Sequence, residues 1–188
     1  ELLDLDARKG KAPGGYCTYF PTYKSPFIFS NFNGTEGDVN VLCHEGGHAF
    51  QAYVCSDMKI PEYTSPTLEG CECHSMSMEF FTWPYMDKFF GKDADKYKYA
   101  HLCDAIEFLP YGATIDEFQH WVYEHPKATH EERCKVFSEI EAKYTPHKKY
   151  DECPTLAKGR IWLRQSHIFA TPFYYIDYTL AQVVAFQF

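Results

Sequence analysis

The sequence has no excess of positive charge, no low-complexity segment and no internal repeat. Its 18 Lys and Arg residues are outnumbered by 26 Asp and Glu residues, which gives a formal net charge of -8 at pH 7. Nucleic acids and anionic membranes repel such a protein, so we expect neither as its partner. The chain has 188 residues, of which 18% are aromatic, so it is long enough and apolar enough to form a folded region with its own core.

The sequence also lacks an uninterrupted apolar run of the length that crosses a membrane. Its most apolar stretch, residues 169–188, is about as long as a membrane span. Four residues interrupt that stretch, namely Pro172, Asp177, Gln182 and Gln187. We therefore predict a buried helix there. The chain starts without Met and stops on apolar residues, so we expect a piece of a longer protein.

The sequence contains eight cysteines but lacks the signals that usually accompany disulfides. No secretory signal begins at Glu1, and the chain is far longer than a miniprotein held by disulfides. We therefore expect the eight cysteines to be mostly reduced thiols, and the protein to be cytoplasmic. Cys71, Cys73 and His74 resemble a metal cluster, but side chains at one-residue spacing point to different sides of a helix. A metal site made of these three residues is therefore disfavoured.

Strand and helix patterns occupy different parts of the chain. Aromatic and β-branched residues mix with turn formers over residues 14–35, which predicts short strands joined by turns. From Asp38, predicted as an N-cap, the pattern becomes helical. We predict a mainly α-helical domain over residues 1–188, with a small antiparallel β-sheet near its N-terminus.

Capping and proline signals predict the later helices. Thr114 with Glu117, and Thr129 with Glu132, match the capping box and would each start a helix. The remaining predictions are a helix from about residue 67 that Pro84 ends or kinks, one over 94–108, one from residue 156 through 169, and a last one through Tyr175 and Tyr178 after a break at Pro172.

The most informative segment is VLCHEGGHAFQAYV, at residues 41–54. On a helix, His44 and His48 lie one turn apart on the same face and can direct two imidazoles at one point. Such a pair suits a zinc site, and Glu45 lies where it could take a proton from a water bound there. His-Glu-x-x-His is therefore a metallopeptidase signature.

Two adjacent glycines in this helix strengthen that interpretation. Gly46 and Gly47 each cost a helix interior about 1 kcal/mol relative to Ala. Two in a row have little structural use in a core helix, unless something approaches the helix closely at that point. We therefore expect a close approach there.

A third metal ligand should come from another helix. Glu69, Glu72 and Glu79 share roughly one face of the helix predicted from residue 67. Burying three carboxylates there is costly without cations, which a metal and its histidines would supply. A thermolysin-type site is disfavoured, because Thr67 and Leu68 stand where its Glu would be.

These motifs resemble the oligoendopeptidase F and thimet oligopeptidase family of zinc metallopeptidases. The likeness rests on HEGGHAF, on CECHSMSMEF two dozen residues later, and on SHIFATPFYYIDYTLAQ near the end of the chain. LDLDARKGKAPGGYCTYF resembles the segment that precedes the active-site strand in the family. The resemblance implies a helical, zincin-like catalytic domain that hydrolyses oligopeptides, without the N-terminal helical part of the family.

The resemblance also implies residue roles. His44, His48 and Glu72 would bind one Zn²⁺, Glu45 would be the general base, and Glu79 would fix a ligating histidine through its far nitrogen. His167, Tyr175 and Tyr178 would donate to the substrate carbonyl, with Tyr174 as an alternative to His167. Gly14, Gly15 and Tyr16 would lie on the strand that pairs with the peptide.

Two other functions are weighed against this one. A zinc carboxypeptidase or dipeptidase of similar build would need a cation facing the cleft, for which Lys24, Arg160 and Arg164 are candidates. A non-catalytic helical module stabilised by zinc would need a fourth ligand, from Cys73 or His74. The sequence does not predict an oligomeric state.

Overall fold

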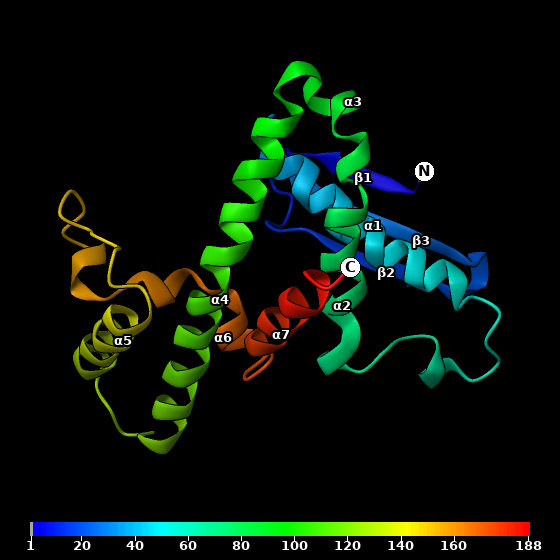
Figure 1. Cartoon of the computed structure of the whole chain (residues 1–188). Helices are drawn as coiled ribbons and strands as arrows, with labels where there is room; N and C mark the ends of the chain where they lie inside the picture. Colours follow the sequence, from blue (N-terminus) through cyan, green and yellow to red (C-terminus); the bar gives the residue numbers. More distant parts are fainter. Residues whose placement is uncertain (1) are drawn as a thin grey trace. The chain divides into compact units, whose positions relative to one another are not determined.

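The computed structural model describes residues 2–188 and confirms a mainly α-helical fold with a small sheet near the N-terminus. Figure 1 shows the elements in chain order. The chain divides into two compact units, which we describe separately. The first unit comprises Glu1–Leu102 and Ala181–Phe188, and the second unit comprises Cys103–Leu180.

The sheet of the first unit has three strands in the order β1-β3-β2. A short 3-10 turn joins β2 (Tyr16–Phe20) to β3 (Ser25–Phe32), and these two strands are antiparallel as predicted. The prediction is wrong for β1 (Leu3–Asp6), which pairs with β3 in parallel. The reason is that residues 7–15 carry the chain past β3, so β1 and β2 lie on opposite sides of that strand.

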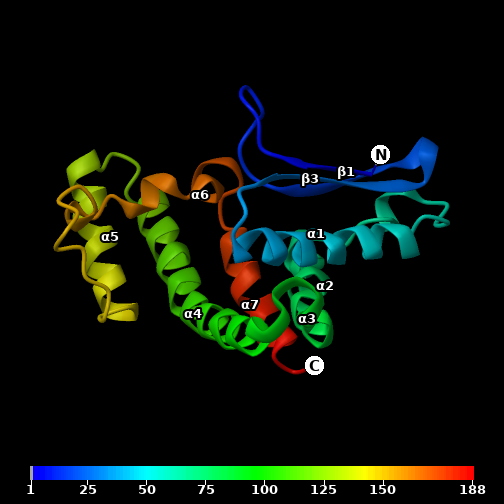
Figure 2. The same ribbon diagram turned by 90° about the horizontal axis from the view of Figure 1, so that it is seen from above.

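Two long helices pack next to the sheet, with α1 between the sheet and α2 (Figure 2). Helix α1 (Glu36–Val54) begins after Thr35, so the prediction of Asp38 as N-cap is wrong. The Asp38 carboxylate instead accepts the backbone N–H groups of Asn33 and Gly34, at 3.0 and 2.6 Å, and thus fixes the turn that enters the helix. Helix α2 (Leu68–Phe81) begins after Thr67, close to the predicted start.

After α2 the chain makes a 3-10 turn that contains Pro84 (Trp83–Tyr85), then the short α3 (Asp87–Phe90) and a turn at Gly91–Asp93. Helix α4 (Ala94–Glu124) follows without interruption, so the prediction of a separate helix capped by Thr114 is wrong. Pro110 lies inside α4, and the Thr114 hydroxyl donates back to the Pro110 carbonyl at 2.9 Å. The hydroxyl that could have capped a new helix is thus used within the existing one.

The second unit has an aromatic core of Phe118, Phe137 and Trp162, all buried. Helix α5 (His130–Tyr144) begins with the predicted capping box of Thr129 and Glu132. The helix predicted from residue 156 is wrong, because the chain forms only 3-10 turns at Leu156–Lys158 and Ile161–Arg164 before the short α6 (Ser166–Ala170). Gly159, at φ +70°, separates these turns, and a Cβ there would lie 2.1 Å from the Cys134 carbonyl.

Helix α7 (Tyr175–Ala185) confirms the last predicted helix. Among residues 2–188, no helix combines the length and the apolar character that a membrane crossing requires. The structure pairs none of the eight cysteines in a disulfide.

Candidate metal centre

Three side chains from α1 and α2 converge in the first unit. His44 and His48 point from successive turns of α1, and Glu72 points from the second turn of α2. One potential ligand atom from each of the three lies within 4.8 Å of the others. Glu72 is 4% exposed, and among residues 2–188 no further His, Cys, Asp or Glu belongs to this group.

The spacing of these atoms fits a tetrahedral zinc ion. The Nε2 atoms of His44 and His48 lie 3.1 and 3.4 Å from Glu72 Oε2. Two ligand atoms at about 2.05 Å from one zinc, at the tetrahedral angle, are about 3.3 Å apart. Two imidazoles and one carboxylate are also a known catalytic zinc set, which leaves a position open for water. The residues present therefore fit the metal that the sequence predicts.

The electrostatics of the cluster also favour a cation. Burial lowers the pKa of His44, but the hydrogen bonds and negative charges of Glu72 and Glu79 outweigh that effect and raise the pKa to about 10. A positive charge at this point is therefore stabilised by two carboxylates. The same two carboxylates would stabilise the positive charge of a divalent metal ion.

The close packing of α1 on α2 brings these residues together, and Gly47 permits it. A Cβ on Gly47 would lie 2.6 Å from Ser75 Cα and 2.7 Å from the His74 carbonyl oxygen. The expected close approach is thus confirmed for Gly47, and the approaching group is α2. Gly46 has open space at its Cβ position, so packing among residues 2–188 does not explain this second glycine.

Glu45 lies beside the cluster on α1 and is 7% exposed. Burial raises the pKa of this carboxyl, against the lowering effects of His44, His48 and the backbone of Cys17 on β2. A carboxylate whose pKa is raised is a better proton acceptor than one in water. Its place between the cluster and β2 agrees with the predicted role of general base.

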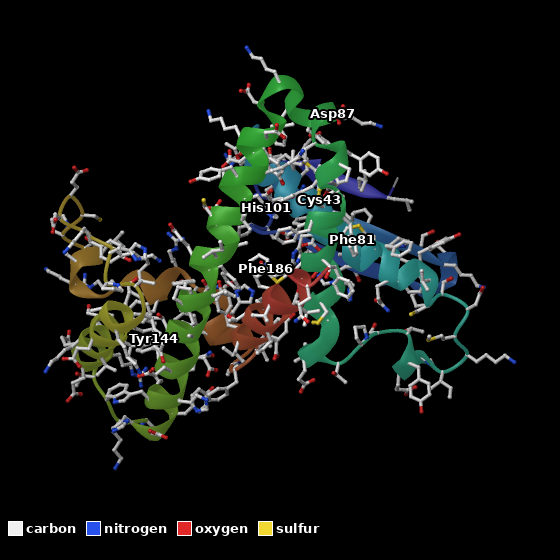
Figure 3. The ribbon with its side chains drawn as sticks, viewed as in Figure 1. Cys43, Phe81, Asp87, His101, Tyr144 and Phe186 are labelled. Carbon is white, nitrogen blue, oxygen red and sulfur yellow. The ribbon has the colours of Figure 1, made fainter. Side chains whose placement is uncertain are left out.

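Behind His44 lie Glu79, which the sequence predicts, and His101, which it does not. Glu79 Oε1 lies 2.8 Å from His44 Nδ1, which agrees with the role that the resemblance implies for Glu79. The other oxygen of Glu79 lies 2.7 Å from Nε2 of His101, on α4 (Figure 3). His101 lies 22 positions after Glu79, on another helix, so no local spacing could have indicated it.

Behind His48, the partner is a second imidazole. Nδ1 of His48 lies 2.9 Å from Nε2 of His74. His74 therefore contacts the far nitrogen of His48, away from the Nε2 that faces Glu72. The group of potential ligands found among residues 2–188 contains neither His74 nor Cys73, so it does not support a closed site in which either residue is a fourth ligand.

In the second unit, the predicted donors gather in one group. The ring of His167 lies 5.1 Å from that of Tyr175 and 5.5 Å from that of Tyr178, and the rings of Tyr174 and Tyr178 are 5.0 Å apart. Tyr175 is 9% exposed and belongs to the aromatic core, and burial raises its pKa. Its burial is that of a packing residue, whereas Tyr178 is half-buried.

The predicted peptide-binding segment leads into β2, which forms one edge of the sheet. Gly15 lies close to α1, since a Cβ there would be 3.1 Å from Val41 Cγ1. Tyr16 begins the strand and stacks on Phe29 of β3, at 4.9 Å between ring centroids. Gly14 has φ +94°, a backbone conformation that favours glycine.

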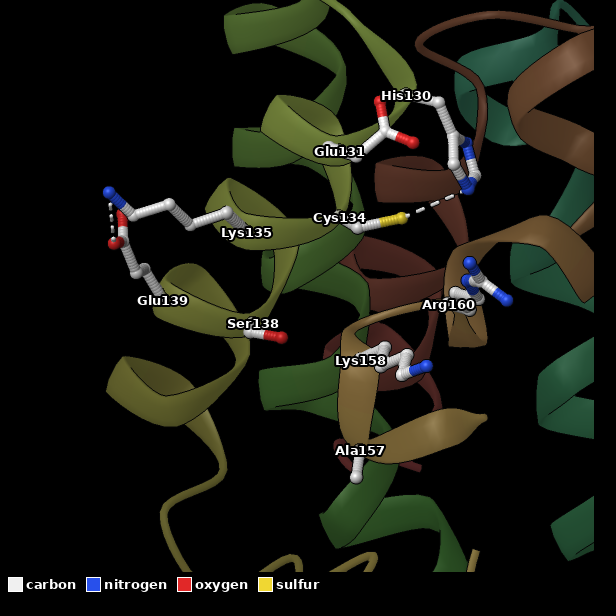
Figure 4. Close-up of a pocket in the computed structure, with 9 residues that line it drawn as sticks. All are labelled: His130, Glu131, Cys134, Lys135, Ser138, Glu139, Ala157, Lys158 and Arg160. Atoms are coloured by element: carbon white, nitrogen blue, oxygen red, sulfur yellow. Dashed lines mark hydrogen bonds and ion pairs between the residues drawn. The ribbon is translucent and has the colours of Figure 1, made fainter. Parts of the chain in front are cut away.

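Of the three cations considered for a carboxypeptidase, Lys24 lies in the first unit, and Arg160 and Arg164 lie in the second. Lys24 forms an exposed ion pair with Asp57 at 2.6 Å. Arg160 lines a pocket of about 440 Å³ between α5 and the turns that follow it (Figure 4). In this pocket, Cys134 Sγ lies 3.5 Å from His130 Nε2. Arg164 lies in the turn Ile161–Arg164 of the second unit.

Comparison with known proteins decides the family. The model of peptidase family M3 matches residues 1–188. The chain belongs to peptidase family M3.

Solved structures agree with the M3 assignment. PZ peptidase A, solved with an inhibitor, and a structure described as oligoendopeptidase F each share 63% sequence identity with the chain at a TM-score of 0.96. An oligoendopeptidase F from Bacillus anthracis strain Ames shares 57% identity at a TM-score of 0.84. All three comparisons cover 99% of the chain. The chain covers 33, 33 and 30% of those proteins, so it spans about a third of their length. None of the curated proteins compared with the chain matches it.

Proposed function

We propose that the chain is the catalytic part of a zinc-dependent M3 oligopeptidase, with His44, His48 and Glu72 as the metal ligands. The observation that carries this proposal is the convergence of two imidazole Nε2 atoms and one carboxylate oxygen within 4.8 Å. The M3 match and the relatives described as oligoendopeptidase F support peptide hydrolysis as the reaction.

In the proposed reaction, each residue near the cluster has a separate task. When bound there, zinc supplies a Lewis acid that polarises a carbonyl and makes water a stronger acid. The Glu45 carboxylate accepts a proton from the attacking water and passes it to the leaving amine nitrogen. Its burial beside the ligands keeps bulk water away from that proton. Glu79 and His74 hold the far nitrogens of the two ligating histidines.

We place the peptide substrate along the free edge of β2. A peptide can add a strand to a sheet edge through backbone hydrogen bonds, and Gly14, Gly15 and Tyr16 lead into that edge. The donors to the substrate carbonyl are proposed to be His167 and Tyr178, with Tyr174 as the alternative to His167. Tyr175 keeps the role that the resemblance implies, although its burial is that of a core residue.

We also propose the domain organisation, the substrates, the metal content and the location of the chain. The two units together form a single catalytic region of a longer M3 protein, the substrates are oligopeptides, and one Zn²⁺ binds per chain. The location that we propose is cytoplasmic, as the sequence leads us to expect.

Metal content, measured by mass spectrometry on the purified chain, tests the ligand set. We expect about one zinc per chain, and loss of most of it in Glu72→Gln. Glu69→Gln is the matched control, because Glu69 lies one turn earlier on α2 but is exposed. Zinc that is undiminished in Glu72→Gln, or lost equally in both variants, would contradict the assignment.

A second variant separates binding from catalysis. Glu45→Gln keeps the size of the side chain and removes the proton acceptor. We expect it to retain zinc and to lose at least about a hundredfold in peptide hydrolysis in the longer M3 protein, as for loss of a general base. Hydrolysis at the unaltered rate would exclude Glu45 as the base.

A further inference from the structure

Four side chains form a continuous line of hydrogen bonds that ends at the candidate metal centre. The Trp83 ring N–H donates to His101 Nδ1 at 3.0 Å. His101 Nε2 lies 2.7 Å from Glu79 Oε2, and Glu79 Oε1 lies 2.8 Å from His44 Nδ1. The four residues come from four different segments, α1, α2, the turn Trp83–Tyr85 and α4. All of them lie in the first unit.

The indole at the start of this line determines where each proton lies. An indole N–H can only donate, so His101 Nδ1 must accept and carries no proton. The proton of neutral His101 is therefore on Nε2, where it is donated to Glu79. The second oxygen of Glu79 can then accept the Nδ1 proton of His44. When a metal is bound there, His44 can therefore offer it the lone pair of Nε2, the nitrogen that lies 3.1 Å from Glu72 Oε2.

The surroundings of His101 protect this arrangement from water. His101 is 5% exposed, and its ring packs against Phe80 at 5.0 Å and parallel to Tyr97 at 5.8 Å. Hydrogen bonds are electrostatically stronger in such surroundings, and a polar group without a partner is costly there. Burial raises the pKa of Glu79, but the hydrogen bonds from His101 and His44 outweigh it and lower the pKa.

We propose that Trp83 and His101 are positioning residues, which act through Glu79 to fix the tautomer and orientation of His44 as a metal ligand. This inference rests on the proposed function, since it assumes that His44 binds the metal. It adds two residues to which the sequence analysis assigns no role in the site. If their role were purely structural, both residues would serve only to pack the aromatic cluster around Phe80 and Tyr97.

Variants that preserve shape separate these two accounts. Trp83→Phe keeps an aromatic ring and removes the donor, whereas His101→Leu removes the donor to Glu79 and His101→Gln retains an amide donor. Trp162→Phe is the matched control. Trp162 is buried, whereas Trp83 is half-buried, and the ring N–H of Trp162 has no hydrogen-bond partner within residues 2–188.

The first readout is the tautomer of His101, from nuclear magnetic resonance of protein with ¹⁵N-labelled histidine and no added metal. We expect a proton on Nε2 and none on Nδ1 in the unaltered chain, and a mixture of both tautomers in Trp83→Phe. A proton on Nδ1 in the unaltered chain would overturn the inference, whether or not the protein binds zinc.

The second readout is zinc affinity, measured by competition with a chelating dye. We expect His101→Leu to bind zinc at least about tenfold more weakly, as for other residues that support a ligand, and His101→Gln to recover most of that loss. Trp83→Phe should weaken binding about threefold, as for loss of one hydrogen bond, and Trp162→Phe should not change it. Equal affinity in all variants would overturn the inference and leave the proposed function intact. If the unaltered chain binds no zinc, the proposed function itself fails.

Discussion

The two histidines of the candidate metal centre are held in different ways. His44 contacts a buried carboxylate, Glu79, which His101 and Trp83 support in turn. His48 contacts His74, a half-buried imidazole. Burial lowers the pKa of His74, and the charge of His48 adds to the effect, so the pKa is about 4 and His74 is a neutral acceptor near pH 7.

Two ligands of one motif therefore need not contribute equally to metal binding. A carboxylate acceptor increases the basicity of the histidine that donates to it more than a neutral imidazole does. We therefore expect His44 to be the stronger and more rigid ligand and His48 the weaker one. Single substitutions can disturb both sides of the site together, the His44 side alone or the His48 side alone.

The largest effect is expected from Gly47→Ala, which would disrupt both sides at once. The added methyl group would lie 2.6 Å from a backbone atom of α2, so the two helices must separate. The free energy of unfolding should fall by about 3 kcal/mol, the upper range for overpacking, and most of the bound zinc should be lost. Denaturant unfolding and metal content measure the two effects.

Gly46→Ala is the matched control for this prediction. Its Cβ would meet open space, and replacing a helical glycine by alanine should raise the free energy of unfolding by up to about 1 kcal/mol. If both variants unfolded alike, the contact of Gly47 with α2 would not be what limits the helix spacing.

The next largest effect is expected from Glu79→Gln, on the His44 side. The variant keeps the shape but replaces the charged acceptor by a neutral amide, so His44 loses basicity and the acceptor of the His101 proton loses its charge. Zinc affinity should fall about 100-fold, the upper end for a group that supports a ligand. Competition with a chelating dye measures this change, and a loss of less than threefold would refute the special role of the carboxylate.

The smallest effect is expected from His74→Ala, on the His48 side. The neutral acceptor is lost, but His48 Nδ1 can then donate to water because the site is half-buried. Zinc affinity should fall about tenfold, the lower end of the same range, and His74→Gln should recover part of it. A loss as large as that of Glu79→Gln would remove the difference between the two ligands.

The sequence could predict the elements of the site that lie close together in the chain. His44, Glu45 and His48 are one helical turn apart, so local geometry alone places them on one face. Among the three glutamates of α2, spacing could not decide the ligand. The structure brings Glu72 to the histidines and leaves Glu69 exposed.

What could not be predicted depends on packing between distant segments. His101 reaches Glu79 only because α4 packs near α2, and no residue pattern around position 101 encodes that contact. Thr114 and Glu117 match a capping box as well as Thr129 and Glu132 do, yet only the second pair caps a helix. The first pair lies within α4, where the apolar residues Ile115 and Phe118 are fully buried.

Zinc X-ray absorption spectroscopy of the metal-loaded chain tests the central claim most directly, because it identifies the ligand atoms themselves. The account predicts only nitrogen and oxygen neighbours at about 2.0–2.2 Å, with the outer-shell scattering of two imidazole rings. Sulfur at about 2.3 Å would instead place Cys71 or Cys73 on the metal. That result would contradict the site of His44, His48 and Glu72 and favour a closed, structural zinc.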